Sequence, residues 1–300
     1  MKKTILFLII LIIGVYVSLS FLAKNDDYAI EKILWGLNNE IIDLAKDPKA
    51  VPPDQFDSVI ERCRKVIAEY PDSKIILKPY LDVARLYTLK EDYATSRIEY
   101  ARAIDNFEEN HEVVAGIMSS IGRTYEMEEN WKSANEVYQR IIKDYSGTRV
   151  GLNMPLYIAY HYRQLNDYTH TVESFQAAIN HYRSLINKHP DTLLAFRSYN
   201  NLARTYLDQM RWEDGLKVYG EILTVYAVPK KIPAQRAQNI IKTMNTISAA
   251  KLKNFNIVTE IFNQIMIENP DHEMTKYLNI LVQSLGELEK KAAEAASKKK

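Results

Sequence analysis

Apolar and polar side chains follow one another along this chain with the period of an α-helix. In residues 27–45, and again from residue 54 to residue 288, apolar positions recur three and four residues apart, with polar and charged residues between them. No stretch of strictly alternating apolar and polar residues, the pattern of a half-buried β-strand, stands out. The pattern therefore predicts an all-α fold built from short amphipathic helices.

One helical unit is repeated along most of the chain. Residues 118–145 predict two amphipathic helices joined by a tight turn, and aromatic residues mark three equivalent positions that recur roughly every 37–44 residues. The first-helix tyrosines are Tyr87, Tyr125, Tyr162 and Tyr206. The turn aromatics are Phe56, Tyr93, Trp131, Tyr168, Trp212 and Phe255. The second-helix aromatics are Tyr100, Tyr138, Phe175, Tyr219 and Phe262, and Cys63 takes this position in the first repeat.

Repetition at this period predicts a stacked array, because one helix pair cannot bury its apolar face alone. Two longer spacings fit the same array. About seven extra residues within 181–190 add nearly two turns, so that helix lengthens without rotating its buried face. Pro229 and Pro233 end another helix and lengthen the connection that follows. We expect the aromatic positions to be core, so that Trp131→Ala costs about 3–5 kcal/mol of stability.

Small and polar residues occupy further fixed positions in the repeat. A small residue, which lets two helices approach closely, stands three positions before each first-helix tyrosine: Ala84, Gly122, Ala159 and Ala203. A residue with a short side-chain oxygen stands immediately before four of the turn aromatics: Asp92, Asn130, Asp167 and Asn254. Such an oxygen can accept hydrogen bonds from the free N–H groups that open a helix, so these residues predict caps of the second helices.

These residues resemble the tetratricopeptide repeat family. The family's small residue and tyrosine of the first helix correspond to Ala84 with Tyr87, Gly122 with Tyr125 and Ala203 with Tyr206, and its second-helix signature corresponds to Trp131, Ala134 and Tyr138. The resemblance covers about residues 54–271. Its closing proline is present only at Pro71 and Pro270, and its turn glycine is replaced by Glu91, Glu129, Asn166, Met210 and Lys253.

The resemblance implies a right-handed superhelical solenoid of about six helix pairs in residues 24–271. It also implies a scaffold that binds a protein or peptide partner. The expected first pair begins with the amphipathic stretch 27–45, whose second helix follows the linker 47–53. The apolar stripe in residues 272–289 predicts a helix that caps the array, or alternatively one through which the protein forms homo-oligomers. Residues 290–300 are basic and predict a flexible tail.

The N-terminal segment 1–23 has the character of a membrane anchor. Lys2 and Lys3 precede a long uncharged and mainly apolar run, and residues 5–23 as a helix would span roughly 28 Å, close to the hydrocarbon core of a bilayer. The positive-inside tendency would keep the two lysines in the cytoplasm and export the remainder. A cleaved signal peptide is the alternative, with 18–20 as a passable small–x–small site.

Composition and motifs give no sign of catalysis. The charges nearly balance, with 39 Lys and Arg against 38 Asp and Glu, so net charge predicts no nucleic-acid partner. The single cysteine, Cys63, excludes an intramolecular disulfide and is expected to be a core residue. His161, His170, His181 and His189 lack the spacing and the companion ligands of a metal site. No phosphate loop, metalloprotease motif or nucleophile elbow is present, so we expect no enzyme, no cofactor and no bound metal.

One row of residues is a candidate binding site. In the family the first helices line the concave groove, so the resemblance implies that the position after the small residue faces a ligand. That position holds Arg85, Arg123, Tyr160 and Arg204. Three guanidiniums and a phenol suit an acidic or carboxylate-bearing extended peptide, because arginine binds carboxylates with a planar fork. The alternative is pairing within each helix, with Asp82, Glu126 and Asp208 as the carboxylates.

Together these observations predict a single-pass protein of the bacterial cytoplasmic membrane whose repeat domain lies on the extracytoplasmic side. Its expected role, by analogy with envelope proteins of this family, is a scaffold or adaptor that holds a protein or peptide partner. One alternative is a soluble periplasmic adaptor or chaperone released by signal cleavage. Another is a regulatory or substrate-capturing subunit of an envelope enzyme.

Overall fold

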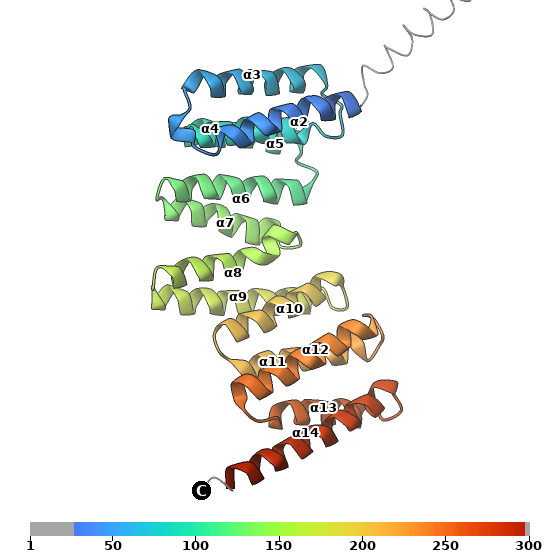
Figure 1. The fold of residues 1–300 in the computed structure, drawn as a ribbon. Coiled ribbons are helices and arrows are strands. Elements are labelled where there is room, and N and C mark those ends of the chain that lie inside the picture. The colour runs from blue at the N-terminus through green and yellow to red at the C-terminus, as the bar shows by residue number, and fades with distance from the viewer. Residues whose placement is uncertain (1–26, 298–300) are drawn as a thin grey trace, which may run out of the picture. The chain divides into compact units, whose positions relative to one another are not determined.

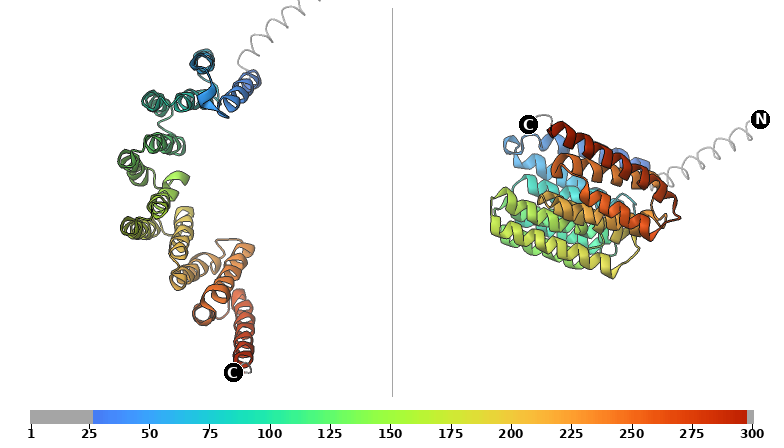
Figure 2. Two further views of the ribbon diagram at one scale, coloured as in Figure 1. Left: turned by 60° about the vertical axis from the view of Figure 1, so that its left-hand side comes forward. Right: turned by 90° about the horizontal axis from the view of Figure 1, so that it is seen from below.

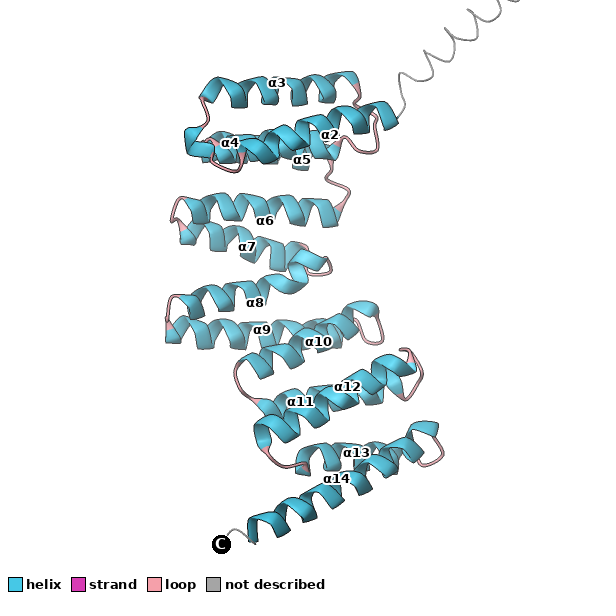
Figure 3. Cartoon of the chain, in the orientation of Figure 1, coloured by secondary structure: helices cyan, strands magenta, loops and turns pink. Residues whose placement is uncertain are grey.

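The computed structural model describes residues 27–297, and every regular element in this range is a helix (Figures 1 and 3). The all-α prediction is confirmed. The chain divides into two compact units, one extending to Gly151 and the other beginning at Leu152. Each unit is a series of consecutive helix pairs, as the repeat pattern predicted.

The N-terminal unit contains three helix pairs. Its helices are α2 (Asp27–Leu44), α3 (Pro53–Glu69), α4 (Leu77–Leu89), α5 (Tyr93–Asn106), α6 (His111–Met127) and α7 (Trp131–Asp144), with a 3₁₀ turn at Pro48–Ala50 in the linker. Several of these helices are seen close to end-on in the left panel of Figure 2, so their axes run nearly parallel. The first pair is α2 with α3, as expected from the amphipathic stretch 27–45.

The C-terminal unit contains three further pairs and a last helix. Its elements are α8 (Arg149–Gln164), α9 (Tyr168–Lys188), α10 (Leu193–Asp208), α11 (Trp212–Ile222), α12 (Ala234–Ile247), α13 (Asn256–Glu268) and α14 (Glu273–Ser297). Short π-helical turns, η3 (Leu223–Ala227) and η4 (Ser248–Leu252), extend α11 and α12. The predicted lengthening within 181–190 appears as the 21-residue helix α9. Helix α8, whose first residues belong to the N-terminal unit, contains Pro155 within it.

All four predicted capping residues accept hydrogen bonds from N–H groups that open the second helices, three of them from the N-cap position. The side chains of Asp92, Asn130 and Asp167 accept hydrogen bonds from backbone N–H groups three residues later, each at 3.1 Å. Asn254 also accepts a hydrogen bond from an N–H group that opens its helix, that of Asn256 at 3.3 Å, although Phe255 rather than Asn254 holds the N-cap position of α13. Thr192 and Asn110 cap the first helices α10 and α6 in the same way, which the repeat pattern did not indicate.

The turn between the two helices of a repeat keeps a left-handed backbone without glycine. The five residues at the family's glycine position all have φ between 56° and 60°: Glu91, Glu129, Asn166, Met210 and Lys253. In four of these turns the N–H of the following residue donates to the carbonyl of the first-helix tyrosine, as in Asn130 to Tyr125 at 2.9 Å. This bond is the one that closes a helix at a left-handed residue. The turn geometry therefore does not depend on glycine, although glycine would adopt it with less strain.

The small residues lie where helices meet, as predicted. Ala84, Ala159 and Ala203 have no exposed surface. Gly122 is the tightest of the four positions, because a Cβ atom there would lie 2.2 Å from Cε1 of Tyr138. Cys63 is also fully buried, and burial raises the pKa of its thiol to about 12.

The prediction of a buried aromatic ladder is correct for the second-helix aromatics and wrong for most of the turn aromatics. Four of the five second-helix rings are buried: Tyr100, Tyr138, Phe175 and Phe262. Among the turn aromatics only Phe56 is buried, Trp131 and three others are half-buried, and Tyr168 is 80% exposed. Four of the exposed or half-buried turn aromatics are the first residues of their helices, and Phe255 is an N-cap, so these rings lie at the edges of their helix pairs. Phe56 is instead the fourth residue of α3, one turn inside the helix, and it is buried.

Two predicted segments lie at or beyond the ends of the described range. The expected membrane anchor, residues 1–23, lies outside the described residues. Among residues 27–297 no helix is both long enough and apolar enough to cross a bilayer. Helix α14 continues to Ser297, so most of the segment expected to be a tail belongs to this last helix.

Candidate ligand-binding surface

The four candidate ligand-binding residues fall in the two units. Arg85 lies on α4 and Arg123 on α6 in the N-terminal unit, while Tyr160 lies on α8 and Arg204 on α10 in the C-terminal unit. All four lie on the first helices of their pairs, as the repeat pattern predicted. Their surroundings differ between the units, so each pair is described separately.

Arg85 and Arg123 have exposed side chains, and neither pairs with a carboxylate in the part of the chain that the structure describes. The carboxylates proposed as partners within the helix are engaged elsewhere. Asp82 is bound by Nζ of Lys78 at 2.9 Å. Glu126 accepts a hydrogen bond from the hydroxyl of Tyr138 at 3.0 Å. Pairing within the helix therefore does not account for these two arginines.

Tyr100 links the two arginines in space. Burial raises the pKa of its hydroxyl, and hydrogen bonds with Thr88 and Ser120 oppose that rise. The positive charges of Arg85 and Arg123 also oppose it. Both guanidiniums therefore act electrostatically on the hydroxyl of Tyr100, from α4 on one side of α5 and α6 on the other. The sequence identified Tyr100 only as a core position. Periodicity shows that a ring is buried, but it does not show which charged side chains lie around its hydroxyl.

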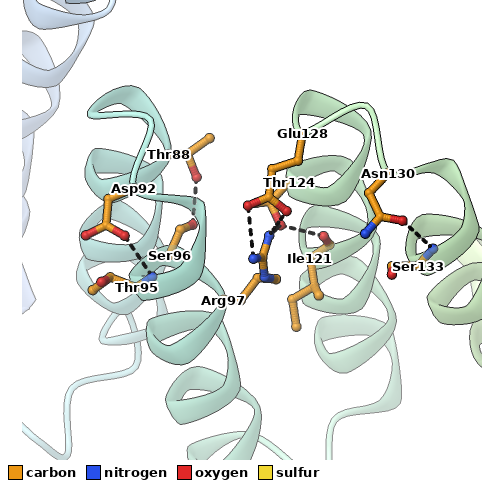
Figure 4. Close-up of polar contacts among 10 residues, drawn as sticks. All are labelled: Thr88, Asp92, Thr95, Ser96, Arg97, Ile121, Thr124, Glu128, Asn130 and Ser133. Carbon is orange, nitrogen blue, oxygen red and sulfur yellow. Dashed lines mark hydrogen bonds and ion pairs between the residues drawn. The ribbon is translucent and has the colours of Figure 1, made fainter.

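Two other arginines in this unit are engaged in structural contacts. Arg97 of α5 reaches the next repeat, where its guanidinium donates to the carboxylate of Glu128 at 2.8 and 3.1 Å (Figure 4). The same guanidinium lies 4.2 Å from the ring centroid of Tyr125. Arg64 of α3 binds Glu99 at 2.8 Å and the hydroxyl of Tyr87 at 3.3 Å. In both cases an arginine on a second helix holds the first-helix tyrosine of the following repeat. Arg85 and Arg123 are distinguished from these two by having no such partner.

The candidate residues of the C-terminal unit satisfy one another. The hydroxyl of Tyr160 donates a short hydrogen bond to Asp208, whose carboxylate also lies 3.5 Å from Nε of Arg204. The ring of Tyr160 lies under the guanidiniums of Arg163, at 4.7 Å, and Arg204, at 5.6 Å. Burial and the nearby charge of Asp208 raise the pKa of Tyr160 to about 12. Here the alternative prediction of pairing between Arg204 and Asp208 is correct, and the phenol is engaged within the protein.

Sequence reasoning missed the role of Arg163 in this network. It stands three residues after Tyr160, on the same face of α8, and its Nη1 donates to the carbonyl oxygen of Asp208 at 3.3 Å. Spacing alone could have placed Arg163 beside Tyr160. It could not have indicated that Asp208, which lies 45 residues after Arg163, would meet both residues.

No metal site is formed by the residues that the structure describes, since no group of three or more His, Cys, Asp and Glu side chains comes together. His170 stacks on Tyr162 with 4.9 Å between ring centroids and pairs with Asp167 at 2.6 Å. His181 is largely enclosed beside Tyr182, and burial lowers its pKa. Each of these two histidines therefore packs against an aromatic ring of its own repeat.

The fold defines a helical-repeat protein. Residues 120–148 match the tetratricopeptide repeat family, which confirms the resemblance inferred from the sequence. This segment contains the turn from α6 to α7, with Gly122, Tyr125, Trp131 and Tyr138 at the family positions. The family suggests a protein-interaction scaffold rather than a catalyst.

Three solved structures are similar to the chain. BtubC (BKLC) from P. vanneervenii is 13% identical over 76% of this chain and 89% of its own, with a TM-score of 0.38. The TPR2AB domain of yeast Sti1 in its pHSP90 complex is 16% identical over 83% and 98%, and Cut9–Hcn1 of the APC/C is 14% identical over 87% and 56%, each with a TM-score of 0.29. No curated protein sequence matches the chain. All three TM-scores lie below 0.5, so no partner or activity follows from them.

Proposed function

We propose that this protein is a membrane-anchored tetratricopeptide-repeat scaffold that binds a carboxylate-bearing protein or peptide on the extracytoplasmic side of the membrane. The observation that carries the proposal is the pair Arg85 and Arg123, which are exposed, equivalent in consecutive repeats and free of carboxylate partners. Two guanidiniums beside one phenol offer planar, charge-assisted hydrogen bonds to carboxylates. Tyr160 and Arg204 supply a weaker contribution, because Asp208 competes for both.

The binding experiment compares Arg85→Ala/Arg123→Ala with Arg140→Ala. Arg140 is an exposed arginine in the same unit but on the second helix α7, so it controls for the loss of positive charge. The probe is a fluorescent acidic peptide of Asp and Glu residues, titrated against the full chain in detergent, with the Asn and Gln version as the neutral comparison. We expect the double variant to lose at least tenfold in affinity and Arg140→Ala to lose little. Equal binding by all three proteins, or equal binding of the neutral peptide, would exclude the proposed site.

The anchor and the location rest on residues 1–23. An uncharged apolar run behind two lysines supports an uncleaved anchor with the repeats outside the cytoplasm. Mass spectrometry of the mature N-terminus and alkaline extraction of membranes test it. A protein that keeps residues 1–23 and stays in the membrane fraction after alkaline extraction supports the anchor. Cleavage after residue 20 with release of soluble protein would replace it by a periplasmic adaptor.

A further inference from the structure

Helix α2 of the N-terminal unit exposes one apolar face in the part of the chain that the structure describes. Its buried stripe consists of Ile30, Leu34, Leu37, Ile41 and Leu44. On another side of the helix, Trp35 is 69% exposed and Ile42 is 45% exposed. These two residues are seven positions apart, nearly two helical turns, so they lie on one side of α2 about 10 Å from each other. We call these two residues the α2 face.

Two contacts of α2 show where its neighbouring helices lie. The helix packs against α3 and α4 (Figure 1). Glu40 of α2 is bound by Arg62 of α3. On the other flank, Asn38 of α2 accepts a hydrogen bond from Nζ of Lys78 of α4 at 3.1 Å. These contacts place α3 and α4 on the two flanks of the buried stripe, and the α2 face lies on the side that neither helix covers.

Charged residues of both signs border the α2 face. Glu31 and Lys32 precede Trp35 by four and three positions, so both are its neighbours on the helix surface. Beyond the other end of the face, Lys46 and Asp43 form an exposed ion pair at 2.7 Å. The charges therefore balance, and burial of the two apolar side chains would supply most of the binding free energy. An occupant with a strong charge of either sign is not indicated.

The segment that precedes α2 determines what lies near this face under the proposed function. That function places residues 1–23 in the bilayer, and α2 begins at Asp27. Four peptide units span no more than about 14 Å even when fully extended. The headgroup region on each side of the hydrocarbon core is roughly 5–8 Å thick. The chain therefore holds the start of α2 within or just outside the lipid headgroups.

The α2 face is too small for a stable interface with a freely diffusing protein. Such interfaces bury about 800 Å² on each partner. A buried aromatic side chain contributes about 150–250 Å², so Trp35 together with Ile42 supplies much less than that area. A membrane surface does not need the full area, because the anchor already holds the chain there and raises the effective concentration of the face at the lipid.

We propose that α2 lies along the outer surface of the membrane that anchors this protein, with Trp35 and Ile42 inserted between the lipid headgroups. Tryptophan suits this depth, because its ring is apolar and its indole N–H can donate to a headgroup. Helix α2 has 18 residues and a length of about 27 Å, and an amphipathic helix can lie in the plane of the interface. The inference rests on the proposed function for the anchor alone, since it involves neither Arg85 nor Arg123.

Trp35 itself is the probe for the test. The full chain is reconstituted into phosphatidylcholine vesicles, and the signal of Trp35 is the fluorescence of the wild type minus that of Trp35→Phe, because Trp131 and Trp212 also emit. We expect phosphatidylcholine brominated on its acyl chains to quench this signal at least twofold, and iodide in the water to quench it little. Replacing about a third of the lipid by phosphatidylglycerol should change both results little, because the charges beside the α2 face balance.

The matched control moves the tryptophan to the opposite side of the same helix. Ile33 lies two positions before Trp35 and is 41% exposed. The control variant is therefore Ile33→Trp/Trp35→Phe, measured against Trp35→Phe. At position 33 we expect brominated lipid to quench at most half as strongly as at position 35, and iodide to quench more strongly.

The outcomes separate the possible occupants of the face. Equal quenching by brominated lipid at positions 33 and 35, or a Trp35 signal that iodide quenches strongly, would overturn the inference. So would a Trp35 signal shielded from both quenchers together with a crosslinked dimer that Trp35→Gln abolishes, which would assign the face to a second copy. Flotation of the vesicles keeps the two proposals apart. A chain that floats with Trp35 open to iodide refutes only this inference, whereas a chain that does not float refutes the anchor as well.

Discussion

Gly122 lies directly against the buried ring of Tyr138, and a methyl group at position 122 would approach Cε1 of that ring to 2.2 Å. Tyr138 is also tied to Glu126, one turn after Gly122 on α6, since its hydroxyl donates to that carboxylate at 3.0 Å and its side chain has no exposed surface. The ring cannot retreat without giving up that bond or its packing. The contact fixes how closely α6 and α7 approach each other.

We therefore expect Gly122→Ala to destabilise the protein by about 1–3 kcal/mol through overpacking. Gly116→Ala is the matched control, because Gly116 lies in the same helix and nothing lies within 4 Å of its would-be Cβ. That variant should gain about 0.5–1 kcal/mol from the better helix propensity of alanine. Urea unfolding followed by circular dichroism measures both changes, and two substitutions with the same sign would contradict the packing argument.

The aromatic positions should differ in their importance for stability. Tyr138→Ala removes a fully buried ring and is expected to cost about 3–5 kcal/mol. Trp131→Ala removes a half-buried ring that lies 6.0 Å from that of Tyr138, so its cost should be roughly 1–3 kcal/mol. Tyr168→Ala, at an 80% exposed site, should change stability by no more than about 0.5 kcal/mol. Thermal unfolding of the three variants tests this order, and a large loss in Tyr168→Ala would refute it.

Replacing the left-handed residue of a turn by glycine should stabilise the protein. Glu129 has φ of 59°, a conformation in which its Cβ approaches the backbone carbonyl, and glycine removes this strain. We expect Glu129→Gly to gain about 0.5–1 kcal/mol. Asn166→Gly, at φ 56°, should gain less, because asparagine tolerates this region better than glutamate. Chemical denaturation of both variants is the measurement, and a loss of stability in Glu129→Gly would show that its side chain has a structural role.

Two histidines should make the stability of the protein depend on pH in opposite directions. Burial lowers the pKa of His181 below 6.5, so the unfolded chain binds the proton more tightly and stability falls as the pH drops below about 6.5. The hydrogen bond with Asp167 raises the pKa of His170, so its contribution is present below pH 6.5 and is lost as the pH rises. Melting temperatures between pH 5 and 8 should show a smaller acid loss in His181→Gln and a larger one in His170→Gln. Parallel curves for both variants would contradict these assignments.

The parts of this structure that the sequence predicted are those set by local chemistry. Three features depend only on residues within one repeat: which face of each helix is buried, the caps at Asp92 and Asn130, and the close approach of two helices at Gly122. The burial of Trp131 and Tyr168 depends on what lies beside the end of a helix, which periodicity does not contain. The bond between Tyr160 and Asp208 joins positions 48 residues apart, so spacing could not reveal it.

Pro155 makes helix α8 easier to bend at one point. Proline has no N–H, so the carbonyl of residue 151 lacks the bond that residue 155 would otherwise donate to it. Gly151 is also the residue at which the first unit ends. Bending of α8 at this point breaks no further hydrogen bond, whereas bending elsewhere in the helix would. Helix α8 thus has a built-in point of compliance in its second turn, next to Pro155.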